Sequence, residues 1–299
     1  MQIITGETTI EKHKYLEQEI YLKREDLNSS GSFKDRLVEY IWPTLLKLPS
    51  KKIVLSSSGN FAISLLYFYI HSGEKLDKEI VIFVSNTLPE LKLTKLKRLI
   101  AQSAQTLIIT KKPKSEAIKY AKQESAYLLR ASSDFTNRFA YTKLGQEILV
   151  YEEKQKIQFD AVFICASSGL AAAGIMEEFL SHSRHLPVYI VQTSHINSIS
   201  KFYDPGVNYE EKTLANAISD RIARNKEPIK ELITKLKGSG VVVNNQEIYL
   251  SLEIFRNLDI DVSLENKLNG NIVLSLAGLF RLLKKGNNFT KPLLIISGN

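Results

Sequence analysis

A repeated order of short apolar runs and helical patterns is the feature that most constrains the fold of this chain. Five runs rich in valine and isoleucine each lead through a short turn into an amphipathic segment, in the stretches that begin at Lys51, Lys78, Gln105, Phe159 and Pro187. Strands that alternate with helices of this length form parallel sheets covered by helices on both faces. Continuous apolar strands fit that arrangement, because both of their faces are buried. The sequence therefore predicts an α/β protein with a three-layer αβα architecture and mostly parallel sheets.

The expected helices follow these runs directly. Their ranges are 61–73, 88–104, 111–125, 170–182 and 195–203, with a last helix over 270–286 and a last strand over 291–299. Residues 203–228 form a long polar segment, and long loops of this kind are often lids or interface segments. The charged stretch 151–158 is placed to link two halves. We therefore expect a smaller domain over residues 36–150 and a larger domain built from residues 1–35 and 151–299.

The composition excludes several classes of protein. The chain has 299 residues, of which 44% are hydrophobic and 24% charged, as in ordinary globular proteins. Cys165 is the only cysteine, so no internal disulfide is possible, which fits a reducing cytosol. The first residues lack the order of a secretory signal. The longest apolar run, residues 61–70, is about half of the ~20 residues that a membrane span needs. We expect a buried helix there, and a cytoplasmic protein without membrane contact.

The net charge of +8 favours an anionic partner. The most basic run carries Lys92, Lys95, Lys97 and Arg98, spread around helical turns with leucines between them. No aromatic side chains that could stack on bases are interleaved, so a solvated helix face is favoured over a nucleic-acid surface. An anionic substrate or cofactor remains compatible with the charge.

Lys34 lies in the segment KREDLNSSGSFKDR, at a point where a helix is expected to begin. Ser32 is placed to cap that helix, and Asp35 three residues later completes a variant of the capping box. A cation is disfavoured in a first helical turn, because the unpaired N–H groups and the peptide dipoles are positive there. The same field lowers the pKa of a lysine and makes its amine a better nucleophile toward a carbonyl. Taken alone, however, the motif fits a capped surface helix with a solvated lysine better.

Three further turns follow predicted strands and carry small polar residues: SSSGN at 56–60, CASSGLAAAG at 165–174 and IISGN at 295–299. Ligands bind at the carboxyl ends of strands in open α/β sheets. The first turn suits a carboxylate, and the second suits a phosphate on helix N–H groups, but not a nucleoside triphosphate, because it lacks the Lys-Thr pair of a Walker loop. The third turn places a neutral hydroxyl after a buried strand. Each is also compatible with an ordinary turn or strand end.

Together, the four segments resemble the fold-type II pyridoxal-phosphate enzymes, the tryptophan synthase β superfamily. The first is similar to that group's lysine motif, K-x-E-x-x-N-P-T-G-S-F-K-D-R, and SSSGNFA resembles its asparagine loop. SSGLAAAG stands in the place of its phosphate loop, and SGN in the place of its pyridine-nitrogen serine. The resemblance runs along nearly the whole chain. It implies pyridoxal 5′-phosphate as the cofactor, bound in the cleft between two α/β domains, and a homodimer.

The resemblance also implies a role for each residue. Lys34 would hold the cofactor as a Schiff base and then act as the base that moves protons. Asn60 would contact the ring 3′ oxygen, and Ser297 would contact the pyridine nitrogen. The substrate carboxylate would be bound by Ser57, Ser58, Gly59 and Asn60. The cofactor phosphate would be bound by Ser167, Ser168, Gly169 and Leu170. A serine at the ring nitrogen does not stabilise a protonated ring, which suits elimination and replacement at the β carbon.

The chain departs from the family pattern at two motifs. Ser29 and Ser30 stand where the motif has Pro-Thr, and Gly169 is the only glycine where the phosphate loop has three or more. Serine hydroxyls would then replace some backbone contacts to the phosphate. The glycine-poor loop also motivates the alternative of a non-catalytic binding or regulatory relative.

A threonine synthase-like β,γ-replacement on a small-molecule amino-acid substrate with a leaving group is the first expectation within the group, because GSFKDR resembles threonine synthase and the dehydratases. A serine or threonine dehydratase, or a cysteine synthase-like enzyme, is the alternative. No metal site is expected, because His182 and His185 form an H-x-x-H without further ligands nearby. Cys165 lies in an apolar strand and fits a buried, inert thiol.

Overall fold

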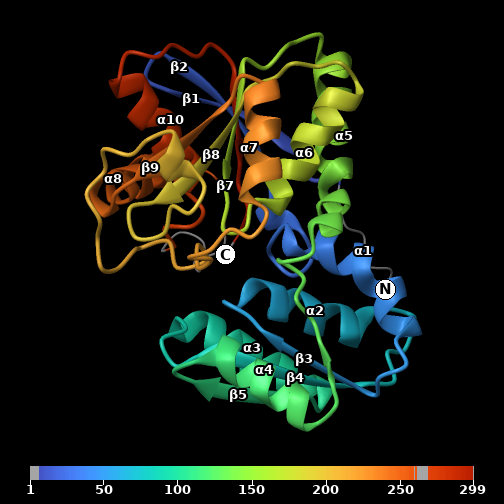
Figure 1. Ribbon diagram of the computed structural model, residues 1–299. Helices are drawn as coiled ribbons and strands as arrows, with labels where there is room; N and C mark the ends of the chain where they lie inside the picture. Colours follow the sequence, from blue (N-terminus) through green and yellow to red (C-terminus); the bar gives the residue numbers. More distant parts are fainter. Residues whose placement is uncertain (1–6, 259, 261–268, 299) are drawn as a thin grey trace. The chain divides into compact units, whose positions relative to one another are not determined.

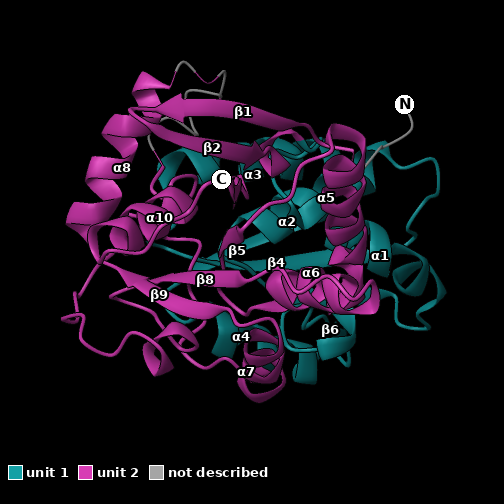
Figure 2. Cartoon of the chain, turned by 90° about the horizontal axis from the view of Figure 1, so that it is seen from above, with its two compact units in different colours: residues 1–5, 28–137 teal, residues 6–27, 138–299 magenta. Residues whose placement is uncertain are grey.

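The computed structural model describes residues 7–258, 260 and 269–298, and each of its two compact units is built on one sheet (Figure 1). Unit 1 comprises residues 28–137, and unit 2 comprises the described residues up to Leu27 together with those from Arg138 onward (Figure 2). The contacts thus place residues 28–35 in the smaller unit and residues 138–150 in the larger one. The division expected from the sequence, 36–150 against the rest, placed both stretches the other way.

The sheet of unit 1 has four strands in the order β5-β4-β3-β6, and every pair is parallel. The strands are β3 (Lys52–Ser56), β4 (Glu79–Ser85), β5 (Thr106–Thr110) and β6 (Tyr127–Leu128). Leu55 pairs with Ile82, and Ile82 pairs in turn with Leu107. The central strands β3 and β4 are buried along most of their length, as the continuous apolar runs predict.

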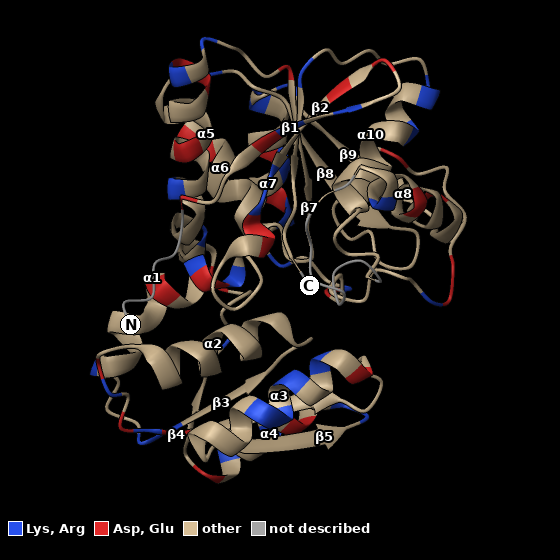
Figure 3. Cartoon of the chain, turned by 180° about the vertical axis from the view of Figure 1, so that it is seen from behind, with Lys and Arg blue, Asp and Glu red and all other residues tan. Residues whose placement is uncertain are grey.

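Helices cover both faces of this sheet. They are α1 (Lys34–Lys47), α2 (Asn60–His71), α3 (Glu90–Ser103) and α4 (Pro113–Gln123). Ala117 and Ala121 of α4 pack on Val54 and Phe83 of the sheet. Helix α2 packs against α1 and α3, and α4 lies on the other side of the strands from α2 and α3 (Figure 2). Helix α3 is rich in lysine and arginine (Figure 3).

The sheet of unit 2 has the strand order β1-β2-β10-β7-β8-β9. The strands are β1 (Ile10–Tyr15), β2 (Gln18–Lys23), β7 (Ala161–Cys165), β8 (Val188–Thr193), β9 (Ser239–Val243) and β10 (Pro292–Ile295). The pair β1–β2 is an antiparallel hairpin, and the other four pairs are parallel. The chain's last described strand thus lies between an N-terminal strand and β7.

The helices of unit 2 form two layers. They are α5 (Thr142–Gln155), α6 (Leu170–Ser181), α7 (Lys226–Lys235), α8 (Asn245–Asn257) and α10 (Leu274–Lys284). Helix α6 packs with α5 and α7, whereas α10 packs with α8 and on β7, β8 and β9 (Figure 1). A Cβ atom at Gly278 would lie 2.4 Å from Val191 Cγ2, so glycine lets α10 approach β8 closely. Short 3₁₀ turns complete the described elements at Glu25–Leu27, Phe135–Tyr141 and Ser200–Phe202.

The predicted α/β architecture with mostly parallel sheets is confirmed, but one predicted helix is wrong. Residues 195–203 contain only the 3₁₀ turn. The side chain of Gln192 accepts the N–H groups of Ile199 at 2.8 Å and Ser200 at 2.9 Å, and this fixes their backbone against β8. The N-terminal hairpin was not among the predicted elements. Within the described residues, no helix is long and apolar enough to cross a membrane.

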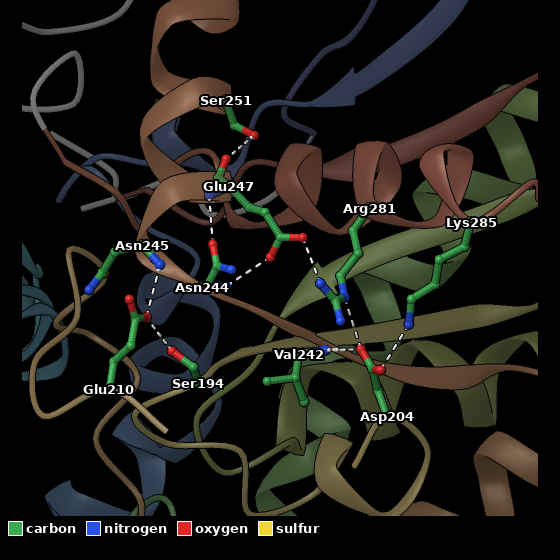
Figure 4. A network of polar contacts seen from close by, with 10 residues as sticks. All are labelled: Ser194, Asp204, Glu210, Val242, Asn244, Asn245, Glu247, Ser251, Arg281 and Lys285. Carbon is green, nitrogen blue, oxygen red and sulfur yellow. Dashed lines mark hydrogen bonds and ion pairs between the residues drawn. The ribbon is translucent and has the colours of Figure 1, made fainter. Parts of the chain in front are cut away.

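A polar network holds the long segment that precedes α7 (Figure 4). Asp204 accepts hydrogen bonds from Arg281 Nε at 3.0 Å, Lys285 Nζ at 2.9 Å and the Val242 N–H at 3.1 Å. Arg281 also donates to Glu247, whose side chain closes the capping box of α8. Glu210 accepts from the Ser194 hydroxyl and from the backbone N–H of Asn245. Hydrogen bonds to the carboxylates of Asp204 and Glu210 therefore hold this segment in place.

We predict that Asp204 makes the stability of unit 2 depend on pH. Burial alone would raise its pKa, but the bonds from Lys285, Arg281 and Val242 outweigh burial and hold the pKa below its ordinary value of about 3.9. The stabilisation is therefore complete above that ordinary value and is lost as the pH falls through the lower native pKa. Asp204→Asn should cost about 1–3 kcal/mol at pH 7, because the amide has no charge and keeps only one of the two oxygens that accept from Arg281 and Lys285.

Thermal midpoints measured from pH 7 to pH 2 test this prediction. The gap between wild type and Asp204→Asn should narrow in acid, once the wild-type carboxyl is also protonated. A gap of constant size across the range would contradict the assignment.

Candidate active site

Helix α1 begins at Lys34, as predicted, but its first turn is arranged differently from the prediction. Phe33 occupies the N-cap position without a side-chain capping bond. The Lys34 N–H reaches the Ser32 hydroxyl only at 3.4 Å. Lys34 Nζ lies 4.7 Å from the centre of the Phe33 ring, and that ring is buried. The lysine side chain thus lies against an apolar ring instead of extending wholly into water.

Asp35 does not form the predicted capping box with Ser32. Its fully buried carboxylate accepts from the backbone N–H of Ser30 at 2.7 Å, from the Ser30 hydroxyl, and from the Ser64 hydroxyl at 2.6 Å. Burial raises the pKa of Asp35, although the hydrogen bonds from Ser30 and Ser64 and the charge of Lys95 act in the opposite direction. The prediction was wrong because the carboxylate turns to donors on Ser30 and on a second helix, which the local motif does not reveal.

The turn 56–60 leaves strand β3 and leads directly into α2. Ser57 Oγ accepts the N–H groups of Gly59 at 3.0 Å and Ala62 at 3.3 Å, so this hydroxyl shapes the turn. Gly59 has a φ of +117°, and a Cβ there would lie 2.9 Å from Lys92 Cδ. Asn60 is the first residue of α2 and is 6% exposed, and its Oδ1 has no hydrogen-bond partner among the described residues. A buried carboxamide oxygen in this state is suited to a ligand.

Two lysines of α3 lie against these two turns. Lys92 is 1% exposed and packs its stem on Gly59. Lys95 Nζ donates to the backbone oxygen of Ser30 at 2.8 Å. The prediction that the basic side chains of this helix are solvated is therefore wrong for Lys92 and Lys95. It is confirmed for Lys97 and Arg98, which are exposed. Lys92 and Lys95 are three residues apart, so they lie on the same side of α3 and both face the turns.

In unit 2, the turn 166–169 leaves strand β7 and leads into α6. Gly169 has a φ of +84°, and a Cβ there would lie 2.6 Å from Ile229 Cδ1 and 2.8 Å from Ile199 Cδ1. Gln192 Nε2 holds the turn by donating to the backbone oxygen of Ala166 at 2.9 Å. Within the described part of the chain, the N–H groups of residues 170–172 bond no acceptor, since the first link here runs from Ala173 N–H to Gly169 O. The turn is therefore tightly packed and leads into helix N–H groups that bond no acceptor within the described residues.

The two serines of this turn differ. Ser167 Oγ donates to Asp220 Oδ2 at 3.0 Å and accepts the N–H groups of Ser219 and Asp220, each at 3.0 Å. The hydrogen bonds of the Ser167 hydroxyl are thus made to the long polar segment. A ligand at this turn could contact Ser167 only through its backbone N–H. The Ser168 hydroxyl makes no hydrogen bond within the described residues.

Ser297 follows β10, the strand beside β7, and is 3% exposed. The N–H of the preceding Ile296 donates to Lys23 O at 2.9 Å, and this fixes Ile296 against β2. Ser297 Oγ lies 3.0 Å from Cys165 Sγ. Cys165 is buried as predicted, but its contact with Ser297 was missed. Only the pairing of β7 with β10, which neither motif reveals, brings the two side chains together.

The structure thus groups the candidate residues into two sets. Lys34 and the turn 57–60 belong to unit 1, and the turn 167–170 and Ser297 belong to unit 2. Among the described residues, no group of His, Cys, Asp or Glu side chains is arranged to hold a metal ion. His182 and His185 are both exposed.

Solved structures of known proteins share this fold. An O-ureido-L-serine synthase matches with a TM-score of 0.77 and 14% identity over 98% of this chain and 89% of that chain. The processed form of threonine deaminase isoform 2 from Solanum lycopersicum matches with a TM-score of 0.75 and 18% identity over 98% and 79% of the two chains. A serine racemase from Dictyostelium discoideum matches with a TM-score of 0.73 and 20% identity over 98% and 92%. At these identities the likeness shows the fold.

Sequence comparison identifies the family. No curated protein matches the chain. The profile of the family described as "Pyridoxal-phosphate dependent enzyme" matches residues 2–258, which cover all the candidate residues except Ser297. With that match and the fold-type II architecture, the chain belongs to the pyridoxal-phosphate dependent enzyme family, whose cofactor is pyridoxal 5′-phosphate.

Proposed function

We propose that the chain catalyses elimination or replacement at the β carbon, or the β and γ carbons, of an amino acid, with Lys34 as the base that moves the α proton. One observation carries the proposal most directly. Lys34 is the first residue of α1, and the buried carboxylate of Asp35 follows it directly. That carboxylate accepts a hydrogen bond from Ser64 of α2. Helix α2 begins at Asn60, whose Oδ1 has no hydrogen-bond partner among the described residues. A lysine and a carboxamide held by one rigid link suit a shared ligand.

Two features of the chain fit pyridoxal phosphate. The turn at Gly169 has no room for a side chain and offers the unbonded N–H groups that open α6, which suit a phosphate dianion. The buried Asn60 carboxamide lacks a partner for its oxygen, and its amide group, turned about its last bond, would donate to the ring oxygen. The glycine-poor sequence of the phosphate turn is therefore compatible with phosphate binding.

The proposed roles of the residues follow from their positions. When bound, the cofactor supplies an electron sink for the α carbon of the substrate. Lys34 would hold the cofactor, and its amine would then carry the proton taken from the α carbon. The N–H groups that open α2, with the Ser58 hydroxyl, would bind the substrate carboxylate, because the first N–H groups of a helix attract anions. The Ser297 hydroxyl would face the pyridine nitrogen.

The neutral Ser297 favours elimination or replacement over reactions that need a protonated ring. Within this class, a threonine synthase-like reaction is our first choice from the GSFKDR motif, and the names of the structural neighbours add deamination, racemisation and synthase reactions. A substrate panel of serine, threonine, O-acetylserine and O-phosphohomoserine covers these cases. A non-catalytic relative would bind an amino acid and turn over none of them.

We predict that Lys34→Ala strongly reduces turnover of whichever panel substrate the wild type uses. The loss in kcat should be about a thousandfold, as expected when an enzyme loses its proton-transferring group. Lys47→Ala is the matched control, because Lys47 is an exposed lysine at the opposite end of the same helix.

Product release from the panel, followed for wild type and both variants, checks this prediction. Equal rates in wild type and Lys34→Ala would contradict the role of Lys34. No turnover by the wild type on any substrate would favour the binding relative.

We also predict that Gly169→Ala weakens binding of pyridoxal phosphate by about tenfold or more. Alanine is strained at the φ of +84° that residue 169 adopts, and its Cβ would lie in the space that the side chains of Ile229 and Ile199 occupy. The phosphate turn must therefore shift. Gly206→Ala is the control, because a Cβ there meets nothing within 4 Å. Absorbance titration with the cofactor measures both affinities, and an unchanged affinity in Gly169→Ala would place the phosphate elsewhere.

A further inference from the structure

A buried carboxylate in unit 1 joins the turn of Lys34 to the helix of Asn60. All hydrogen bonds that the described residues make to the Asp35 carboxylate are donated to it, by the N–H and hydroxyl of Ser30 and by the hydroxyl of Ser64. Ser30 belongs to the turn before Lys34, and Ser64 belongs to α2. All three side chains are at least 96% buried. The link is therefore buried and specific in its geometry.

Ser64 lies one helical turn after Asn60, so the two side chains project from the same face of α2. The bond of 2.6 Å from Ser64 Oγ to Asp35 Oδ1 fixes how far α2 can rotate about its axis. A rotation that broke this bond would carry the Asn60 carboxamide away with it. The hydroxyl of Ser64 thus acts on Asn60 through the helix, without touching it.

We propose that Asp35 is a positioning residue, which through Ser64 fixes the direction in which α2 presents Asn60 relative to the turn of Lys34. This inference rests on the proposed function, in which Lys34 and Asn60 act on the same cofactor ring. It also explains why Ser30, which replaces the threonine of the family motif, keeps a hydroxyl: that hydroxyl occupies the same carboxylate oxygen as Ser64 does.

The charges around Asp35 suit this task. A negative group in the first turn of α1 offsets the positive helix end at which Lys34 stands. Lys95 Nζ donates to Ser30 O at 2.8 Å and adds a cation on the other side of the turn. An asparagine at position 35 would present an NH₂ group to donors, so it could not accept all three hydrogen bonds.

Two alanine variants separate positioning from stability. Ser64→Ala and Ser30→Ala each remove one hydroxyl donor from the same oxygen of Asp35. Ser64→Ala cuts the link to α2, whereas Ser30→Ala leaves that link and the bond from the Ser30 N–H intact. Without cofactor, both variants should lose thermal stability by similar amounts. The dissociation constant for pyridoxal phosphate should rise about tenfold in Ser64→Ala and less than about threefold in Ser30→Ala.

A spectroscopic readout tests the direction of Asn60 itself. The visible band of the bound cofactor depends on the protonation of the ring system, to which Asn60 would donate. The pH midpoint of that band should shift by about half a unit or more in Ser64→Ala and stay unchanged in Ser30→Ala. Ser64→Cys, which keeps a weaker donor of similar size, should lie between wild type and Ser64→Ala and serves if the alanine variant does not fold.

Equal affinities and equal band midpoints in the two alanine variants would overturn the inference and leave Asp35 as a stabilising group only. That outcome requires a wild type that binds the cofactor on Lys34. A wild type that does not bind it there would overturn the proposed function, so the two failures are distinguishable.

Discussion

The parallel order of the strands is the constraint on which the candidate site depends. Parallel strands deliver the chain to the same edge of a sheet each time, so the turns that follow them gather there. In unit 1 this edge receives the turn 56–60 after β3. In unit 2 it receives the turn 166–169 after β7 and Ser297 after β10. The small residues of these turns let backbone N–H groups stay accessible to an anion.

A lysine at the start of a helix is the second constraint, because its charge opposes the field of the first turn. The chain resolves this conflict with a buried acid next in sequence, Asp35, whose hydrogen bonds reach back to Ser30 and across to Ser64. The same interaction that stabilises the start of α1 also orients α2. Local electrostatics and the geometry of the candidate site therefore have a common origin in unit 1.

Much of the fold could be predicted from the sequence, because apolar runs and turn residues encode it locally. The strands at 52–56, 79–85 and 161–165 all begin or end within a few residues of their predicted limits. A helix over 195–203 was predicted wrongly, because the side chain of Gln192 on the preceding strand accepts the N–H groups of Ile199 and Ser200. The hairpin at 10–23 was missed, since it breaks the strand-helix order on which the prediction relied.

The candidate site could be predicted less fully, for a physical reason. Its motifs are contiguous in the chain, and their positions follow from the strands. The residues that these motifs contact lie far away in the chain. Asp35 contacts Ser64, Cys165 contacts Ser297, and Ser167 contacts Asp220, and each pair is separated by 29 or more residues. One signal was present in the sequence, namely a serine four residues after Asn60, on the face of α2 that the asparagine uses. The contact of Cys165 with Ser297 depends on the pairing of β7 with β10, and that of Ser167 with Asp220 depends on the path of the long segment before α7.

The most direct test of the account is to locate the cofactor on the chain. The purified protein is mixed with pyridoxal phosphate, its visible spectrum is recorded, and borohydride reduction and peptide mass mapping then identify the modified lysine. The account predicts a visible absorption band and a reduced adduct on the peptide that contains Lys34. The absence of a band, or an adduct confined to another lysine, would contradict it.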